Sequence, residues 1–110
     1  VGWCGAAIYF ATSAAATTRK ARGPDSHHGF IIEAKVNVGR MKNMYGYCTT
    51  PPTCNHHPYA KCQDRKNRGP EYHKRGYDSI MFHPHDYHGD SREVVIWDSR
   101  RVLSMRQYHR

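Results

Sequence analysis

The run Ala6-Ala7-Ile8-Tyr9-Phe10-Ala11 near the start of the chain is short, apolar and partly aromatic. This pattern predicts a buried strand. Thr12 or Ser13 follows as a candidate N-cap, and the alanine-rich run 14–22 predicts a helix with cations near its C-terminal end, where the helix dipole favours them. The pair at 23–24, a glycine and a proline, ends the predicted helix.

Further strands are predicted from this point to the end of the chain. They cover 30–38, 77–82, 92–97 and 101–108, and the strand at 92–97 is rich in β-branched residues. Residues 40–76 show no sustained periodicity and predict a long loop. Because most strands follow one another without a crossover helix, we expect an α+β fold with a mostly antiparallel sheet. A chain of 110 residues fits one domain, residues 1–110.

The composition indicates the partners that the chain can attract. Its formal net charge is +8, which favours nucleic acid, an acidic protein surface or the pyrophosphate of a dinucleotide. A basic surface without a specific partner is the alternative. No apolar run approaches the ~20 residues that span a bilayer, so we expect no membrane partner.

Cysteine and histidine gather in the 40–76 segment. Cys48, Cys54, His57 and Cys62, with His56 beside them, are candidate zinc ligands because zinc prefers four such groups in a tetrahedron. Their spacing lacks a Cys-x-x-Cys pair, so we favour the alternative of a basic surface loop whose thiols and imidazoles face water. Without a signal peptide we expect reduced thiols and an intracellular protein, cytoplasmic or nuclear. A second cluster, His83, His85 and His88, favours a metal still less.

Several segments, in their order along the chain, are similar to one family. Residues 5–13 resemble the Gly-x-Gly-Ile-Tyr-Phe-Ala segment of poly(ADP-ribose) polymerase catalytic domains. The strand that ends in Val38-Gly39 and the triplet Tyr77-Asp78-Ser79 also look like segments of that family. Residues 92–98, followed by Arg101-Val102-Leu103, are similar to its Asn-Glu-Tyr-Ile-Val-Tyr-Asp … Gln-Val pattern.

This resemblance implies a fold, an activity and site residues. The fold would be a split, mostly antiparallel sheet of the ADP-ribosyltransferase type, with one helix after the first visible strand. The activity would be that of an NAD+ ADP-ribosyltransferase of the glycosyltransferase class, with NAD as substrate and a protein or nucleic acid as acceptor. Glu93 would be the catalytic carboxylate, and Tyr9, Ala11 and Thr17 would bind the nicotinamide end of NAD.

Two departures from the family pattern affect the expected site. Lys20 stands where the family often has a second tyrosine that covers the other face of the nicotinamide ring. The His-Gly motif of the family lies on a strand that would precede Gly5, and no residue before Gly5 supplies it. We therefore expect the chain to be the C-terminal part of such a domain, truncated at its N-terminus. A catalytically inactive basic module that binds nucleic acid or a partner protein is the alternative function.

Overall fold

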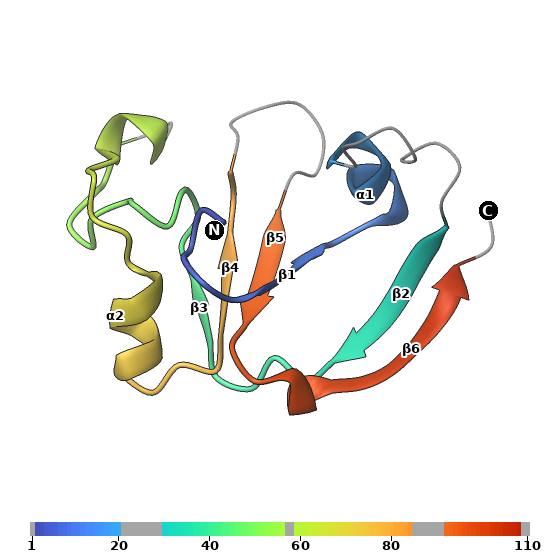
Figure 1. Ribbon diagram of the computed structural model, residues 1–110. Coiled ribbons are helices and arrows are strands. Elements are labelled where there is room, and N and C mark those ends of the chain that lie inside the picture. The colour runs from blue at the N-terminus through green and yellow to red at the C-terminus, as the bar shows by residue number, and fades with distance from the viewer. Residues whose placement is uncertain (1, 21–29, 57–58, 85–91, 109–110) are drawn as a thin grey trace.

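A computed structural model describes residues 2–20, 30–56, 59–84 and 92–108 (Figure 1). The side chains of 19, 20, 59 and 60 lie outside this description. In chain order the elements are β1 (Ile8–Ala11), α1 (Ala14–Lys20), β2 (Ile31–Val36), β3 (Met41–Asn43), the 3-10 helix η1 (Tyr59–Cys62), α2 (Gly69–Lys74), β4 (Ser79–Phe82), β5 (Glu93–Ile96), the 3-10 helix η2 (Ser99–Arg101) and β6 (Val102–Tyr108). No helix in these ranges has the length and apolar character needed to cross a bilayer.

The described strands form two sheets. Four of them make one sheet in the order β1-β5-β4-β3, and β2 pairs with β6 in a separate two-stranded ribbon (Figure 1). The pairs β1–β5, β4–β5 and β2–β6 are antiparallel, whereas β3–β4 is parallel. The predicted α+β class with a mostly antiparallel sheet is therefore confirmed.

Local sequence explains the first helix and the central strands. Ser13 is the N-cap of α1, because its Oγ accepts a hydrogen bond from the Ala16 amide at 3.0 Å. The strand β5 consists of Glu-Val-Val-Ile, and its β-branched side chains suit a strand with neighbours on both sides. The predicted strands at 30–38, 77–82, 92–97 and 101–108 correspond to β2, β4, β5 and β6.

The prediction of a structureless loop over 40–76 is wrong. Within that range the chain forms β3, η1 and α2, and α2 lies on the crossover that joins β3 to its parallel neighbour β4. The three residues of β3 are too few to show a period of two. The helix α2 starts at Gly69-Pro70, a dipeptide that normally indicates a turn, but proline is also favoured in the first turn of a helix.

The hydrophobic core lies between the four-stranded sheet and α2. Ile80, Phe82 and Val95 are fully buried on one sheet face, and Tyr72 of α2 packs in the same cluster at 2% exposure. The Tyr72 ring meets the Tyr77 ring edge-on, with centroids 5.5 Å apart. The buried ring of Tyr72 thus attaches α2, whose six residues show no amphipathic periodicity, to the core.

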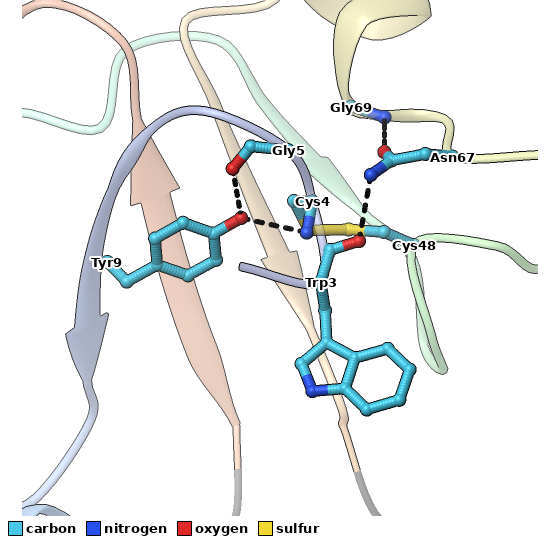
Figure 2. Close-up of a disulfide and its surroundings, with 7 residues drawn as sticks. All are labelled: Trp3, Cys4, Gly5, Tyr9, Cys48, Asn67 and Gly69. Atoms are coloured by element: carbon cyan, nitrogen blue, oxygen red, sulfur yellow. Dashed lines mark hydrogen bonds between the residues drawn. A yellow bond between two sulfur atoms is a disulfide. The ribbon is translucent and has the colours of Figure 1, made fainter. Parts of the chain in front are cut away.

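The N-terminal segment is held against this core by a disulfide, a hydrogen bond and a close backbone contact, and Figure 2 shows the first two. Cys4 forms a disulfide with Cys48, and both cysteines are almost fully buried. The Asn67 side chain donates to the Trp3 carbonyl at 3.1 Å and accepts from the Gly69 amide at 2.8 Å. A Cβ on Gly69 would overlap the Cys4 carbonyl oxygen, so only glycine allows this close approach. The segment before β1 is therefore part of the folded core.

Candidate functional site

A cavity of ≈ 550 Å³ lies where the two sheets separate. Its walls come from β1 and α1 on one side and from β2 on the other, with single residues of β5 and β6 at its border. In Figure 1 the ribbon of β2 and β6 lies to the right of β1. A volume of this size suits a small organic ligand or one end of a dinucleotide.

Three of the four predicted site residues line this cavity. Tyr9 and Ala11 contribute from β1 and Thr17 contributes from α1. Glu93 is not among the described lining residues, but it is the register partner of Ala11 across the β1–β5 pair. Residues directly opposite each other in an antiparallel pair extend to the same face of the sheet. Glu93 therefore lies next to the lining residue Ala11, on the face that carries Tyr9 and Phe82, whereas Val94, the described β5 residue that lines the cavity, is on the opposite face of that strand.

The Tyr9 side chain has a structural role that the sequence did not indicate. Its hydroxyl accepts a hydrogen bond from the Cys4 amide at 2.8 Å and donates one to the Gly5 carbonyl at 2.6 Å (Figure 2). Its ring meets Phe82 edge-on at a centroid distance of 6.2 Å. Burial raises the pKa of the Tyr9 phenol, the Cys4 hydrogen bond opposes this shift, and the charge of Glu93 adds to it. The ring is thus fixed and neutral, with the Glu93 carboxylate near enough to influence it.

The hydroxyl of Thr17 is oriented by its own helix. Thr17 Oγ1 donates to the Ser13 carbonyl at 3.0 Å, the usual back-bond of a helical threonine. Its hydrogen is thereby used, but the oxygen still has acceptor capacity. In this rotamer Thr17 can accept a hydrogen bond from the N–H of a ligand amide.

The wall formed by β2 contains residues that the sequence did not nominate. Ile31, Ile32, Ala34 and Val36 give it an apolar character, and Glu33 is the one carboxylate among the described residues that line the cavity. Glu33 accepts a hydrogen bond from Arg106 of β6 at 2.7 Å, and the Arg106 side chain is 76% exposed and that of Glu33 46% exposed. The alternation of β2 could have indicated a buried face, but only the position of the ribbon opposite β1 shows what that face borders.

The predicted zinc set Cys48, Cys54, His57 and Cys62 does not come together. Cys48 is paired with Cys4 in the core, and Cys54 is paired with Cys62, with their Cα atoms 5.5 Å apart. The expectation of reduced thiols is therefore wrong for this structure. His57 lies outside the described residues, whereas His56 approaches the Cys62 sulfur at 3.3 Å through its Nδ1.

The remaining predicted features are described only in part. Lys20 belongs to α1, but its side chain lies outside the described atoms. His83 follows β4, and its amide donates to the Gly46 carbonyl at 2.7 Å. His85 and His88 lie outside the described residues.

Several cations of the 40–76 segment form ion pairs or cation–π contacts with other residues of the chain. Arg68 is 8% exposed and bonds both Asp64 at 2.6 Å and Glu71 at 3.3 Å. The Arg40 guanidinium lies 4.0 Å from the centroid of the Tyr77 ring, a cation–π contact. The cations of this segment whose residues are exposed to solvent include Lys61, Arg65, Lys66 and Lys74.

No family model, no curated protein and no solved structure matches the chain.

Proposed function

We propose that the chain is an NAD-dependent ADP-ribosyltransferase domain of the poly(ADP-ribose) polymerase type. It would transfer ADP-ribose from NAD to a protein or nucleic-acid acceptor and release nicotinamide. The observation that carries the proposal is the convergence of Tyr9, Ala11 and Thr17 on one cavity, with Glu93 directly across the strand pair from Ala11. Three of these four residues, which sequence similarity nominated, thus line one cavity, and the fourth is the register partner of one of them.

The chemistry of the cavity agrees with the nicotinamide end of NAD. The apolar wall of β2 offers a surface for a flat ring, and stacking on Tyr9, which also lines the cavity, would add ~0.5–1.5 kcal/mol beyond area burial. Ala11 leaves room for the ring to approach the strand. The Thr17 oxygen can accept from the carboxamide N–H, given its back-bond to Ser13.

The proposed reaction breaks the bond between C1′ of the ribose and the nicotinamide nitrogen. Both electrons of that bond go to the ring nitrogen, so nicotinamide leaves as a neutral molecule while positive charge develops on the ribose. A carboxylate beside the ribose stabilises this charge and orients a ribose hydroxyl, and Glu93 would take that role. The acceptor then bonds to C1′ and releases its proton to solvent or to a nearby base.

Nicotinamide release from NAD tests the proposal on the 110-residue chain and on any longer natural form of it. We expect Glu93→Gln to lower the rate by roughly 10²–10³-fold, the usual effect of losing one group that stabilises transition-state charge. Glu33→Gln is the matched control, because Glu33 is a carboxylate that lines the cavity itself and is paired with Arg106. Its rate should remain close to that of the unsubstituted chain.

Two results would contradict the assignment. Loss of activity in Glu33→Gln with activity retained in Glu93→Gln would move the catalytic role to the ribbon. Absence of nicotinamide release from every form, together with no increase of the melting temperature on adding NAD, would refute the enzyme.

A catalytically inactive basic module is the second candidate. It is favoured by Lys20 at the position of the second stacking tyrosine and by exposed cations such as Lys61, Arg65 and Lys74. Binding to a labelled oligonucleotide should then weaken steeply as salt rises, because each neutralised phosphate releases counterions. Affinity that does not change with salt would exclude such phosphate contacts.

A further inference from the structure

We propose that Cys54, His56 and Cys62 form a zinc site that opens when the Cys54–Cys62 disulfide is reduced. The site is distinct from the cavity and does not depend on the proposed enzyme activity. It replaces the four-residue set expected from the sequence with three residues that the structure brings together.

The geometry of the three side chains suits a tetrahedral metal. The Cys54 and Cys62 sulfurs and a ring nitrogen of His56 all lie within 4.8 Å of one another, and His56 Nδ1 is 3.3 Å from the Cys62 sulfur. Zn–S bonds of about 2.3 Å and Zn–N bonds of about 2.0–2.1 Å place tetrahedral ligand atoms roughly 3.5–3.8 Å apart. Once the disulfide is open, the two sulfurs can separate to that spacing, because their Cα atoms are 5.5 Å apart.

The two disulfides differ in their access to a reductant. Cys4 and Cys48 are 1% and 0% exposed and belong to the core, whereas Cys54 is half-buried; its partner Cys62 is less accessible than Cys54, so a reductant would reach the bond from the Cys54 side. The Cys54–Cys62 bond also closes a short segment, with a sequence separation of 8 against 44 for the core bond. A soluble thiol should therefore open Cys54–Cys62 first and leave the core disulfide intact.

The proposed conversion from disulfide to zinc site takes two steps. Two molecules of a thiol reductant donate two electrons and two protons, leave as one disulfide, and convert the bonded pair into the Cys54 and Cys62 thiols. One Zn²⁺ ion then binds both sulfurs and the neutral His56 imidazole, and two thiol protons are released. Water or an external ligand takes the fourth position, as in zinc sites that have three protein ligands. A two-electron oxidant that restores the disulfide expels the metal.

Metal titration of the purified protein tests the site. After mild reduction with a thiol and removal of the excess, two thiols per chain should react with a thiol reagent. Zinc competed against a chromophoric chelator should then bind at one equivalent per chain. Cobalt in place of zinc should give a thiolate-to-cobalt charge-transfer band, and the oxidised protein should bind neither metal at this site.

Adjacent histidines supply the matched control. His56→Ala should weaken zinc binding by more than the roughly 10–100-fold that loss of an outer-shell partner costs, whereas His57→Ala should leave the affinity unchanged. Circular dichroism establishes that both variants are folded. Equal loss in the two variants, zinc binding by the oxidised protein, or no binding by the reduced protein would each overturn the proposal.

Discussion

Removing the Cys4–Cys48 disulfide, which is buried in the core, should destabilise the protein more than removing Cys54–Cys62. The bond joins cysteines 44 residues apart, and a loop of that length gives ~4 kcal/mol of stabilisation in the chain-entropy account. The Cys54–Cys62 bond, with a separation of 8, gives only ~2.5 kcal/mol on the same scale. The difference arises in the unfolded chain, whose freedom the longer loop restricts more.

The assay is urea unfolding of the double variant Cys4→Ala/Cys48→Ala beside Cys54→Ala/Cys62→Ala. The first pair should lose ~4 kcal/mol, a large fraction of the 5–15 kcal/mol that holds a typical domain together. Its melting temperature should fall by on the order of 20 °C. The second pair is the control for removing any disulfide. A loss below ~1 kcal/mol in the first variant, or a larger loss in the second, would refute the reasoning from loop length.

Two further predictions concern single side chains. Tyr9→Phe removes the hydrogen bonds to the backbone of residues 4–5 and should lower the free energy of unfolding in urea by ~1–3 kcal/mol. Because the ring is retained, the proposed affinity for nicotinamide should not change. A parallel loss of affinity would show that the hydroxyl binds ligand. The Arg100 side chain, followed by its amide, holds the pKa of Asp98 at about 2 against an ordinary 3.8. Because this folded-state pKa is lowered, the stabilisation is complete above the ordinary value and is lost as the pH falls through about 2. In Arg100→Ala the Asp98 titration, followed by carboxyl NMR, should move upward, and an unchanged midpoint would contradict the ion-pair cause.

The sequence was informative where local pattern and local chemistry agree. The sequence predicted three features whose formation depends on neighbouring residues: the apolar run before Ser13, the Ser13 cap and the β-branched strand β5. The mostly antiparallel arrangement followed from the absence of obvious crossover helices. The same reasoning missed the parallel pair β3–β4, because α2 starts at a Gly-Pro dipeptide and is only six residues long.

Contacts between residues far apart in the chain could not be predicted from the sequence. Nothing near Tyr9 indicates that its hydroxyl caps the turn at residues 4–5, and nothing near Cys48 identifies Cys4 as its partner. Glu33 entered the cavity only because the ribbon faces β1. Residue types and order predicted the candidate site in part, whereas disulfide pairing and the second wall of the cavity depend on the tertiary fold.

The ribbon of β2 and β6 sets the order in which the molecule can assemble. Its register pairs Ile31 with Tyr108, so the ribbon forms only when the whole segment between these two residues is closed into one loop. Contacts of such long range form late in folding and slow it. We therefore expect the amides of this ribbon to exchange with solvent before those of β4 and β5. Because the ribbon is one wall of the cavity, a ligand bound there would hold the last-formed part of the fold closed.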